Sequence, residues 1–326
     1  MVLKAVQQFQ IRSVVGTEQQ AQDTLKAIKD AGYDGIELCG FLVRPLPKAA
    51  IEMAKAAGIE LESSAELDWK TLIKQSGLEV VGLHEDLDMI LMLTASIVAD
   101  ANAYGTDTIV VTGIRNFDFS DQQAVLDLAE RLNQAGRMLE KEGLRLLYHN
   151  HNSELRKVDA EKTAFQLLIE LTDPNYVNFE FDSYWPTEAG YDALALRNSL
   201  GSRMKLYHIN DRGFRVKGPT ASIIESGSME LGYGNMDLEA LVTTAKSYGV
   251  QAVILESHKN WVNDSPINSL QLSAKFMKST SNFHHLKRLL PSKLPNQGWF
   301  NESYGGKRFT ENGAQSHDLK DHRRSS

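Results

Sequence analysis

The stretch EGLRLLYHNHNSEL, residues 142–155, contains the pattern that decides the fold of this chain. Gly143 follows a long amphipathic segment, and glycine commonly ends a helix in the left-handed conformation. The apolar run Arg145–Tyr148 comes next and predicts a short buried strand. The strand ends in the polar residues HNH, with Glu154 just beyond. The pattern therefore predicts a helix, then a strand, then polar side chains at the strand's carboxyl end.

The same order repeats along the chain and predicts a parallel sheet. Eight units within the first ~280 residues fit a (β/α)8 TIM barrel of the α/β class. An open doubly wound sheet is the alternative, but no glycine-rich phosphate turn follows the first predicted strand. The predicted strands are Lys4–Phe9, Gly35–Leu38, Glu79–Leu83, Thr108–Val111, Arg145–Tyr148, Val177–Phe181, Met204–Ile209 and Ala252–Leu255, with helices among them at Gln20–Ala31, Leu46–Ala57, Asp121–Glu142 and Leu238–Tyr248.

Two segments depart from this alternation. Residues 211–235 read as a long polar loop after the seventh strand. Residues 283–326 carry eight Lys or Arg against four Asp or Glu and have no apolar periodicity. We therefore expect a catalytic barrel over residues 1–282 and a polar, basic, disordered tail over 283–326.

The composition bounds the partners. The chain has 326 residues, 42% of them hydrophobic, and a net charge of −7. An acidic surface repels phosphate backbones, so we expect no nucleic-acid partner. The single cysteine, Cys39, indicates a reducing compartment. No signal peptide and no uninterrupted apolar run long enough for a bilayer is evident. A cytoplasmic enzyme without a membrane partner is the expectation.

The catalytic residues of a (β/α)8 barrel lie at the carboxyl ends of its strands. One such residue alone has an ordinary explanation, as a structural histidine or as a carboxylate at a helix N-terminus. Together they predict a site, because buried carboxylates and imidazoles that converge need a cation to balance them. Six of the eight predicted strands end in a residue that can bind metal or move protons: Glu37, His84, His149, Asp182, His208 and Glu256.

Four of these residues come from the last four predicted strands: His149, Asp182, His208 and Glu256. Their two carboxylates would balance one divalent ion, and a mixed nitrogen and oxygen set suits Mn²⁺, Zn²⁺, Co²⁺ or Fe²⁺, with Mg²⁺ a further candidate. Coordination positions would remain for water or substrate oxygens. The sequence does not decide which metal binds.

The motifs around these residues resemble the xylose isomerase-like TIM barrel superfamily. That superfamily comprises sugar phosphate isomerases and epimerases and is related to inosose dehydratases and endonuclease IV. The resemblance covers roughly residues 4–278. The matching stretches are AVQQFQIRSV, GYDGIELCG, GLEVVGLHEDL, YHNHNSE, FEFDSYW, KLYHINDRG, LGYGNMDLEAL and VILESHK.

The resemblance implies one divalent metal held by Glu, Asp, His and Glu from strands five to eight. Asp182, His208 and Glu256 match that order, whereas the first glutamate falls on His149. Glu154, five residues later, is the alternative first ligand, or a second base. The resemblance also implies that His84 and Glu37 bind substrate or handle protons.

Two reactions follow from this resemblance. The first is sugar or sugar phosphate isomerisation or epimerisation, in which glutamates exchange a proton next to a carbonyl through a metal-stabilised enediolate. Glu256 would be one such base, and Glu154 would have to supply the other. The alternative is a hydro-lyase that dehydrates a keto-inositol or keto-sugar, which needs only one base and one acid, such as Glu256 and His84.

Other residues are candidates for contacts with a small carbohydrate. Trp185 and Phe9 would form apolar walls, although aromatic residues are more often core. His258 and Lys205 would contact hydroxyl or phosphate oxygens, although Lys205 also reads as a solvated charge. An endonuclease IV-like repair enzyme is less favoured because it needs more histidines, and a non-catalytic barrel because the ligand set is intact. Family members often form homo-oligomers, but the sequence leaves the oligomeric state open.

Overall fold

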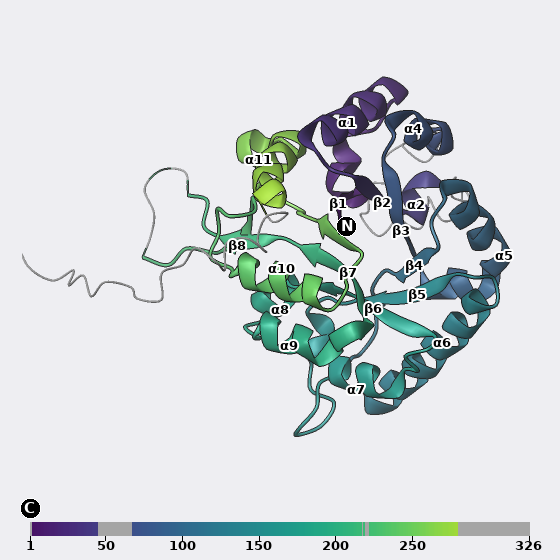
Figure 1. Ribbon diagram of the computed structural model, residues 1–326. Helices are drawn as coiled ribbons and strands as arrows, with labels where there is room; N and C mark the ends of the chain where they lie inside the picture. The colour runs from purple at the N-terminus through teal and green to yellow at the C-terminus, as the bar shows by residue number, and fades with distance from the viewer. Residues whose placement is uncertain (1, 45–66, 217, 219–221, 280–326) are drawn as a thin grey trace, which may run out of the picture. The chain divides into compact units, whose positions relative to one another are not determined.

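The computed structural model describes residues 2–44, 67–216, 218 and 222–279. Eight strands, all paired in parallel, form a closed barrel in the spatial order β1-β10-β7-β6-β5-β4-β3-β2 (Figure 1). The first strand pairs with the last, which closes the ring. The strands are β1 Leu3–Gln7, β2 Gly35–Cys39, β3 Glu79–Glu85, β4 Thr108–Val111, β5 Arg145–His149, β6 Val177–Asp182, β7 Met204–Ile209 and β10 Ala252–Leu255.

Helices surround the strands, and their ends follow local sequence signals. Thr17 and Gln20 form a reciprocal capping box at the start of α1. Gly143 adopts a φ of +75° after α6, as the sequence predicts for the residue that precedes a strand. The main helices are α1 Glu18–Ala31, α4 Trp69–Ser76, α5 Leu87–Tyr104, α6 Gln122–Glu140, α7 Ala164–Leu171, α9 Ala193–Leu200, α10 Leu238–Ser247 and α11 Pro266–Ser279, with short α2 Gly40–Val43 and α8 Tyr184–Glu188.

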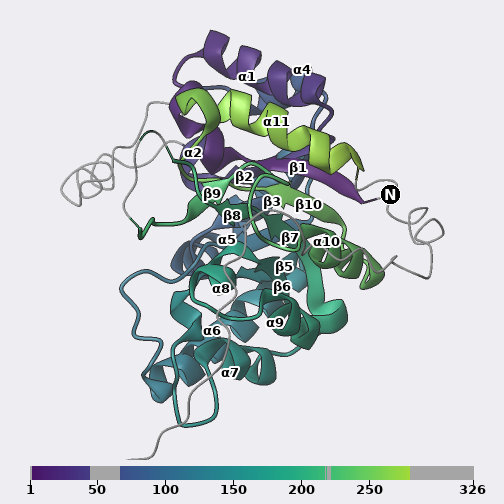
Figure 2. The same cartoon turned by 90° about the vertical axis from the view of Figure 1, so that its left-hand side faces the viewer.

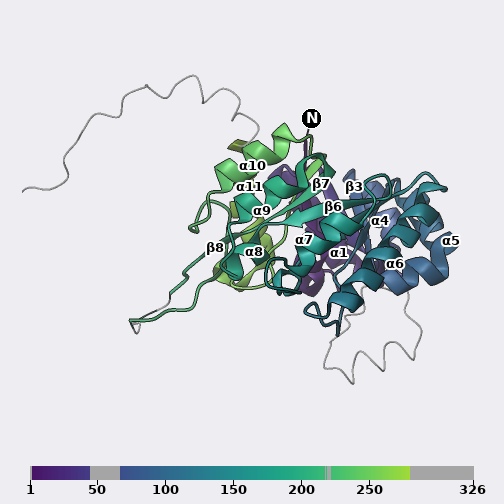
Figure 3. The ribbon, with the colours of Figure 1, turned by 90° about the horizontal axis from the view of Figure 1, so that it is seen from below.

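Helices that are distant in the sequence pack side by side around the ring. Helices α1, α4 and α11 form one group (Figure 2), and α5 lies beside α6 (Figure 3). Among the described helices, α5 alone is long and apolar enough to cross a membrane by length and composition. It packs on β3 and β4, and Ile90 and Ile97 on its inner face are buried. Its apolar character is therefore accounted for in part by its place in the barrel.

The barrel interior has an apolar layer and a polar layer. Side chains that point inward alternate along each strand with side chains that pack against the helices. The polar layer begins two residues further along several strands and is described below. The inner apolar layer consists of Ala5, Val81, Val110, Leu147, Leu206, Ala252 and Ile254.

The predicted α/β barrel is confirmed, and all eight predicted strands are present with ends within two residues of those expected. The prediction of a plain loop over residues 211–235 is wrong in part. That segment contains β8 Asp211–Gly213 and β9 Gly227–Met229, which pair as an antiparallel hairpin. The predicted helix Leu46–Ala57 and the predicted tail, residues 283–326, lie outside the described residues.

Candidate metal centre and active site

The four proposed ligands come together at the carboxyl end of the barrel. Each of His149, Asp182, His208 and Glu256 offers one ligand atom, and these atoms lie within 4.8 Å of one another. Nδ1 of His208 is 3.1 Å from Oε2 of Glu256 and 4.0 Å from Oδ2 of Asp182. All four side chains are buried. Two imidazoles and two carboxylates at this spacing fit one divalent cation in both charge and donor type.

The surrounding backbone holds Asp182 so that one of its oxygens remains available. Oδ1 of Asp182 accepts hydrogen bonds from the backbone N–H groups of Tyr184 and Trp185, at 2.7 and 3.2 Å. The main chain of Asp182 exchanges two hydrogen bonds with the side chain of Asn150. The other carboxylate oxygen, Oδ2, faces His208. The start of α8 therefore fixes the rotamer that points Oδ2 into the site.

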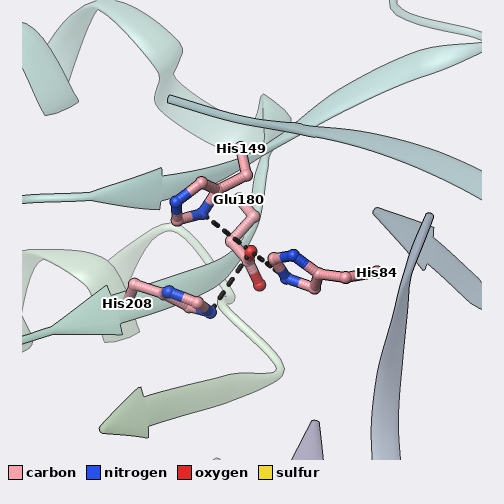
Figure 4. Close-up of side chains that lie close together, drawn as sticks. All are labelled: His84, His149, Glu180 and His208. Atoms are coloured by element: carbon pink, nitrogen blue, oxygen red, sulfur yellow. Dashed lines mark hydrogen bonds and ion pairs between the residues drawn. The ribbon is translucent and has the colours of Figure 1, made fainter. Parts of the chain in front are cut away.

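A second group of buried side chains lies deeper and shares two histidines with the first (Figure 4). Its centre is Glu180, two residues before Asp182 on β6 and on the same face of that strand. Oε2 of Glu180 is 2.9 Å from Nε2 of His84 and 2.9 Å from Nδ1 of His149. The same oxygen is 3.2 Å from Nε2 of His208. One carboxylate oxygen thus contacts three imidazoles.

Glu37 also belongs to this deeper layer. It is fully buried, and β2 continues past it to Cys39, so it is not the last residue of its strand. Oε2 of Glu37 accepts a hydrogen bond from the Gln7 side chain at 2.7 Å and is 2.6 Å from Nε2 of His208. The same oxygen is 3.1 Å from Nε2 of His84. Glu37 therefore contacts His84 and His208 but does not line the cavity described below, which disfavours the direct contact with substrate that the resemblance implies.

The electrostatic balance of the two groups is set by burial and by mutual attraction. Burial alone would raise the pKa of Glu256, but His258 and His208 hold it well below its usual range. Burial would lower the pKa of His84, yet Glu37 and Glu180 raise it to about 10. Burial raises the pKa of Asp182 to about 6, because its neighbours compensate only in part. The pKa values of His84 and His208 are raised by their acidic neighbours, so these two imidazoles place positive charge beside the buried carboxylates.

A cavity of about 400 Å³ opens above the two groups. Its lining includes the rings of Phe9, His258 and His151. The half-buried Trp185 stands behind two of these, with its ring centroid 5.6 Å from that of His151 and 5.7 Å from that of His258. Gly113 leaves room for His151, since a Cβ atom there would lie 2.8 Å from its ring. Aromatic surfaces beside polar groups suit a sugar-sized ligand.

Besides Glu37, two further predicted site residues are placed away from the cavity. Glu154 is fully buried, but Oε1 accepts from the hydroxyl of Tyr148 at 2.8 Å and Oε2 from the backbone N–H of His151 at 3.0 Å. It belongs to neither ligand group and braces the loop after β5 instead. Lys205 is the second residue of β7 and precedes Leu206 of the apolar layer. It does not line the cavity, because Leu206 and His208 point into the barrel and the side chain of Lys205 lies on the opposite, outer face of β7.

Glu180 and His151 were missed as site residues by reading only the last residue of each strand. The signal for Glu180 was available, since FEFD places its two acids two residues apart and hence on one strand face. His151 stands in the quoted HNH run, but it reaches the cavity only because the chain turns after β5. Its burial and the nearby His149 lower the pKa of His151 to about 3, so it is a neutral ring.

The sequence of the chain matches the family model of the xylose isomerase-like TIM barrels over residues 25–280. The chain belongs to this family. Among curated proteins, the inosose dehydratase of Clostridium perfringens is 26% identical over 164 residues, which are 48% of this chain and 54% of that protein. The chain thus spans about half the length of that curated relative.

Solved structures of other proteins share the fold. A sugar phosphate isomerase/epimerase from Parabacteroides distasonis superposes with a TM-score of 0.67 at 19% identity, covering 85% of this chain and 93% of that one. A probable 3-DHS dehydratase from Bacillus anthracis gives a TM-score of 0.59 at 16% identity, covering 85% and 99%. At such identities the likeness establishes the fold alone. The named relatives include both isomerases and dehydratases.

Proposed function

We propose that this protein is a divalent-metal-dependent hydro-lyase that removes water from a keto-inositol or keto-sugar. One observation carries the proposal. Among the described residues that line the cavity, Glu256 is the only carboxylate, whereas His84, His149, His151 and His258 also line it. Epimerisation by two facing carboxylates needs a second acid there, and Glu154 is held in the loop after β5. Dehydration needs one base and one acid, which this cavity offers.

His149, Asp182, His208 and Glu256 would hold the cation, because they form the only described group that combines two carboxylates with two imidazoles. A divalent ion bound there supplies Lewis acidity, which polarises a substrate carbonyl and acidifies the neighbouring C–H bond. The protein supplies the remaining chemistry through side chains that are fixed before substrate arrives.

Glu256 is the proposed base for the proton next to the carbonyl. It stands at the end of β10 with its Oε2 3.1 Å from His208 and 3.5 Å from His258, so neighbouring imidazoles keep it ionised. A carboxylate at the wall of a small cavity is within reach of a C–H bond of a bound sugar ring.

His84 is the proposed acid that protonates the departing hydroxyl. Both of its hydrogen-bonding acids contact Nε2, which leaves Nδ1 without a partner among the described residues. The ring lines the cavity floor, so Nδ1 is the atom able to meet a substrate oxygen. Trp185 and Phe9 would shield the reaction from water on the aromatic side of the cavity.

The decisive experiment incubates the purified protein with Mn²⁺, Co²⁺, Zn²⁺ or Mg²⁺ and a panel of inososes and keto-sugars, followed by mass spectrometry. Dehydration lowers the substrate mass by one water, whereas epimerisation or isomerisation leaves the mass unchanged. Turnover at constant mass would replace the hydro-lyase with an isomerase. Glu256→Gln is the negative control and should reduce turnover by about 10²- to 10⁴-fold, the usual contribution of a positioned acid or base.

A further inference from the structure

The deeper carboxylate, Glu180, contacts both histidines of the proposed metal site but does not itself line the cavity. Its Oε2 is 2.9 Å from Nδ1 of His149 and 3.2 Å from Nε2 of His208. The contacts are therefore made to different ring nitrogens of the two histidines. This difference determines which nitrogen of each ring remains available to bind a metal.

An imidazole nitrogen that donates a hydrogen bond to a carboxylate carries the proton, so the other nitrogen keeps a lone pair for a metal. For His149 the donor is Nδ1, which leaves Nε2 as the ligand atom. For His208 the donor is Nε2, which leaves Nδ1. The second assignment agrees with the geometry, because Nδ1 of His208 is the atom that faces Glu256 and Asp182.

We propose that Glu180 is a positioning residue that holds His149 and His208 in opposite tautomers, so that Nε2 of the first and Nδ1 of the second face a divalent cation. The inference rests on the metal site in the proposed function and extends it to the side chains beneath. Glu37 supports the arrangement at His208, where its Oε2 is 2.6 Å from the same Nε2 atom.

The strand geometry places these two glutamates individually. Pairing between β2 and β3 shifts register between Ile36 and Glu37. Pairing between β6 and β7 shifts between Phe179 and Glu180. Such bulges re-aim side chains and are frequent beside active sites. Both irregularities in the described barrel ladders therefore lie beside the glutamates that contact the histidines, with the extra residue on the partner strand, Val81 of β3 or Lys205 of β7.

Burial of these glutamates is costly without a positive partner. Oε1 of Glu37 and Oε1 of Glu180 are buried and have no hydrogen-bond partner. A buried carboxylate without a positive partner destabilises a fold. The imidazoles, and a cation bound to them, would offset the desolvation free energy of these two carboxylates. Carboxylates that orient metal-binding histidines are the known solution to this balance.

The first test measures metal affinity of the full-length protein by competition with a chromophoric chelator, using Zn²⁺ and Co²⁺. Wild type should bind one ion per chain. Glu180→Gln should bind it about 10- to 100-fold more weakly, the usual effect of removing a residue that orients a metal ligand. The matched control is Glu230→Gln, which alters another buried glutamate that accepts hydrogen bonds from Val262 N and Ser269 Oγ. Its affinity should equal that of wild type.

The second test identifies the protonated ring nitrogens directly, by long-range ¹H–¹⁵N NMR of histidine-labelled protein, first without metal and then with Zn²⁺. Without metal, wild type should show a proton on Nδ1 of His149, and Glu180→Gln should show mixed tautomers there. With Zn²⁺, His208 should carry its proton on Nε2 alone, because its Nδ1, which otherwise hydrogen-bonds Glu256, becomes the ligand atom. The wild-type spectra alone report the protonated nitrogens of both histidines, so the test can be completed even if Glu180→Gln does not fold.

The outcomes that would overturn the inference differ from the outcome that would refute the proposed function. Equal tautomers at the two histidines in wild type with Zn²⁺, no preference for Nδ1 protonation at His149 without metal, or an unchanged affinity in Glu180→Gln would overturn it. Two ions per wild-type chain, with one lost in Glu180→Gln, would show that His84, His149, Glu180 and His208 form a site of their own. A wild type that binds no ion would refute the metal-dependent function, while the NMR result would still judge the role of Glu180.

Discussion

Asn150 and Asp182 hold the ends of two neighbouring strands together through a reciprocal pair of hydrogen bonds. The Asn150 amide donates to the Asp182 carbonyl oxygen at 3.1 Å and accepts from the Asp182 N–H at 3.0 Å. Both residues are buried. The pair couples the position of one proposed ligand, Asp182, to the strand that supplies another, His149.

Replacement of that amide should loosen the site. Asn150→Asp keeps the shape but replaces the donor with an oxygen that faces the Asp182 carbonyl, so we expect a loss of about 1–3 kcal/mol in the free energy of unfolding. Urea denaturation with an unchanged m-value measures it. Asn178→Asp is the control, because the hydrogen bond of Asn178 to Pro174 is exposed and longer, at 3.4 Å. Equal losses in both variants would contradict the proposed coupling.

Metal removal should destabilise the folded protein. A ligand that binds only the native state adds RT ln(1 + [L]/Kd), or about 2.7 kcal/mol at a free concentration of 100 Kd. We expect the thermal midpoint to fall after treatment with a chelator and to recover when a divalent ion is restored. Asp182→Asn should remove most of this metal-dependent shift. A midpoint that does not respond to metal in wild type would count against the four-residue site.

Glu154 should contribute to stability and not to metal binding. Its carboxylate accepts hydrogen bonds from Tyr148, the His151 backbone and Ser153. Glu154→Gln should therefore retain wild-type metal affinity while losing about 1–3 kcal/mol of stability at neutral pH. A loss of bound metal in this variant would restore Glu154 as the first ligand, the alternative that the sequence leaves open.

The same variant makes a prediction about pH. Burial raises the pKa of Glu154, although hydrogen bonds from the backbone and from Tyr148 lower it in part. The folded carboxyl thus binds a proton more readily than the unfolded one, whose ordinary pKa is 4.5. Wild type should gain stability relative to Glu154→Gln as the pH falls through the folded pKa, and the gain should level off below the unfolded value. Denaturation of both proteins across this range measures it.

Replacement of Lys205 should have no effect on catalysis. Because its side chain lies on the outer face of β7, opposite to Leu206 and His208, Lys205→Ala should leave turnover and KM of the proposed reaction unchanged. His258→Ala, which removes a ring from the cavity wall, should raise KM or lower kcat. Steady-state kinetics with the substrate found in the panel separates the two. A higher KM in Lys205→Ala would show that the lysine reaches the substrate after all.

The sequence predicted the barrel well because its signals are local. Gly143 and similar residues end helices by their own backbone preference, and the apolar runs that follow have little alternative to a buried strand. The proposed ligands could be predicted for a similar reason, since functional residues of a (β/α)8 barrel lie at the carboxyl ends of its strands. His149 and His208 needed no tertiary information beyond that rule.

The depth of each side chain could not be predicted in this way. Glu37 and Glu180 lie at register shifts, and a shift depends on how two strands pair rather than on either sequence alone. The same limit applies to Glu154, whose partner Tyr148 points to the opposite side of β5 from His149. The β8–β9 hairpin was missed because its paired segments are only three residues long.

The pairing of β1 with β10 has a consequence for biosynthesis. Residues Leu3–Val6 find their partners only at Ala252–Leu255, so one flank of the first strand stays open on the ribosome until nearly all of the barrel has been made. Pairing between strands so distant in the sequence is slow, and an unpaired edge of β1 can meanwhile pair with other nascent chains. Closure of the ring therefore waits for the last strand, and the edge of the first strand stays unpaired until that strand has been synthesised.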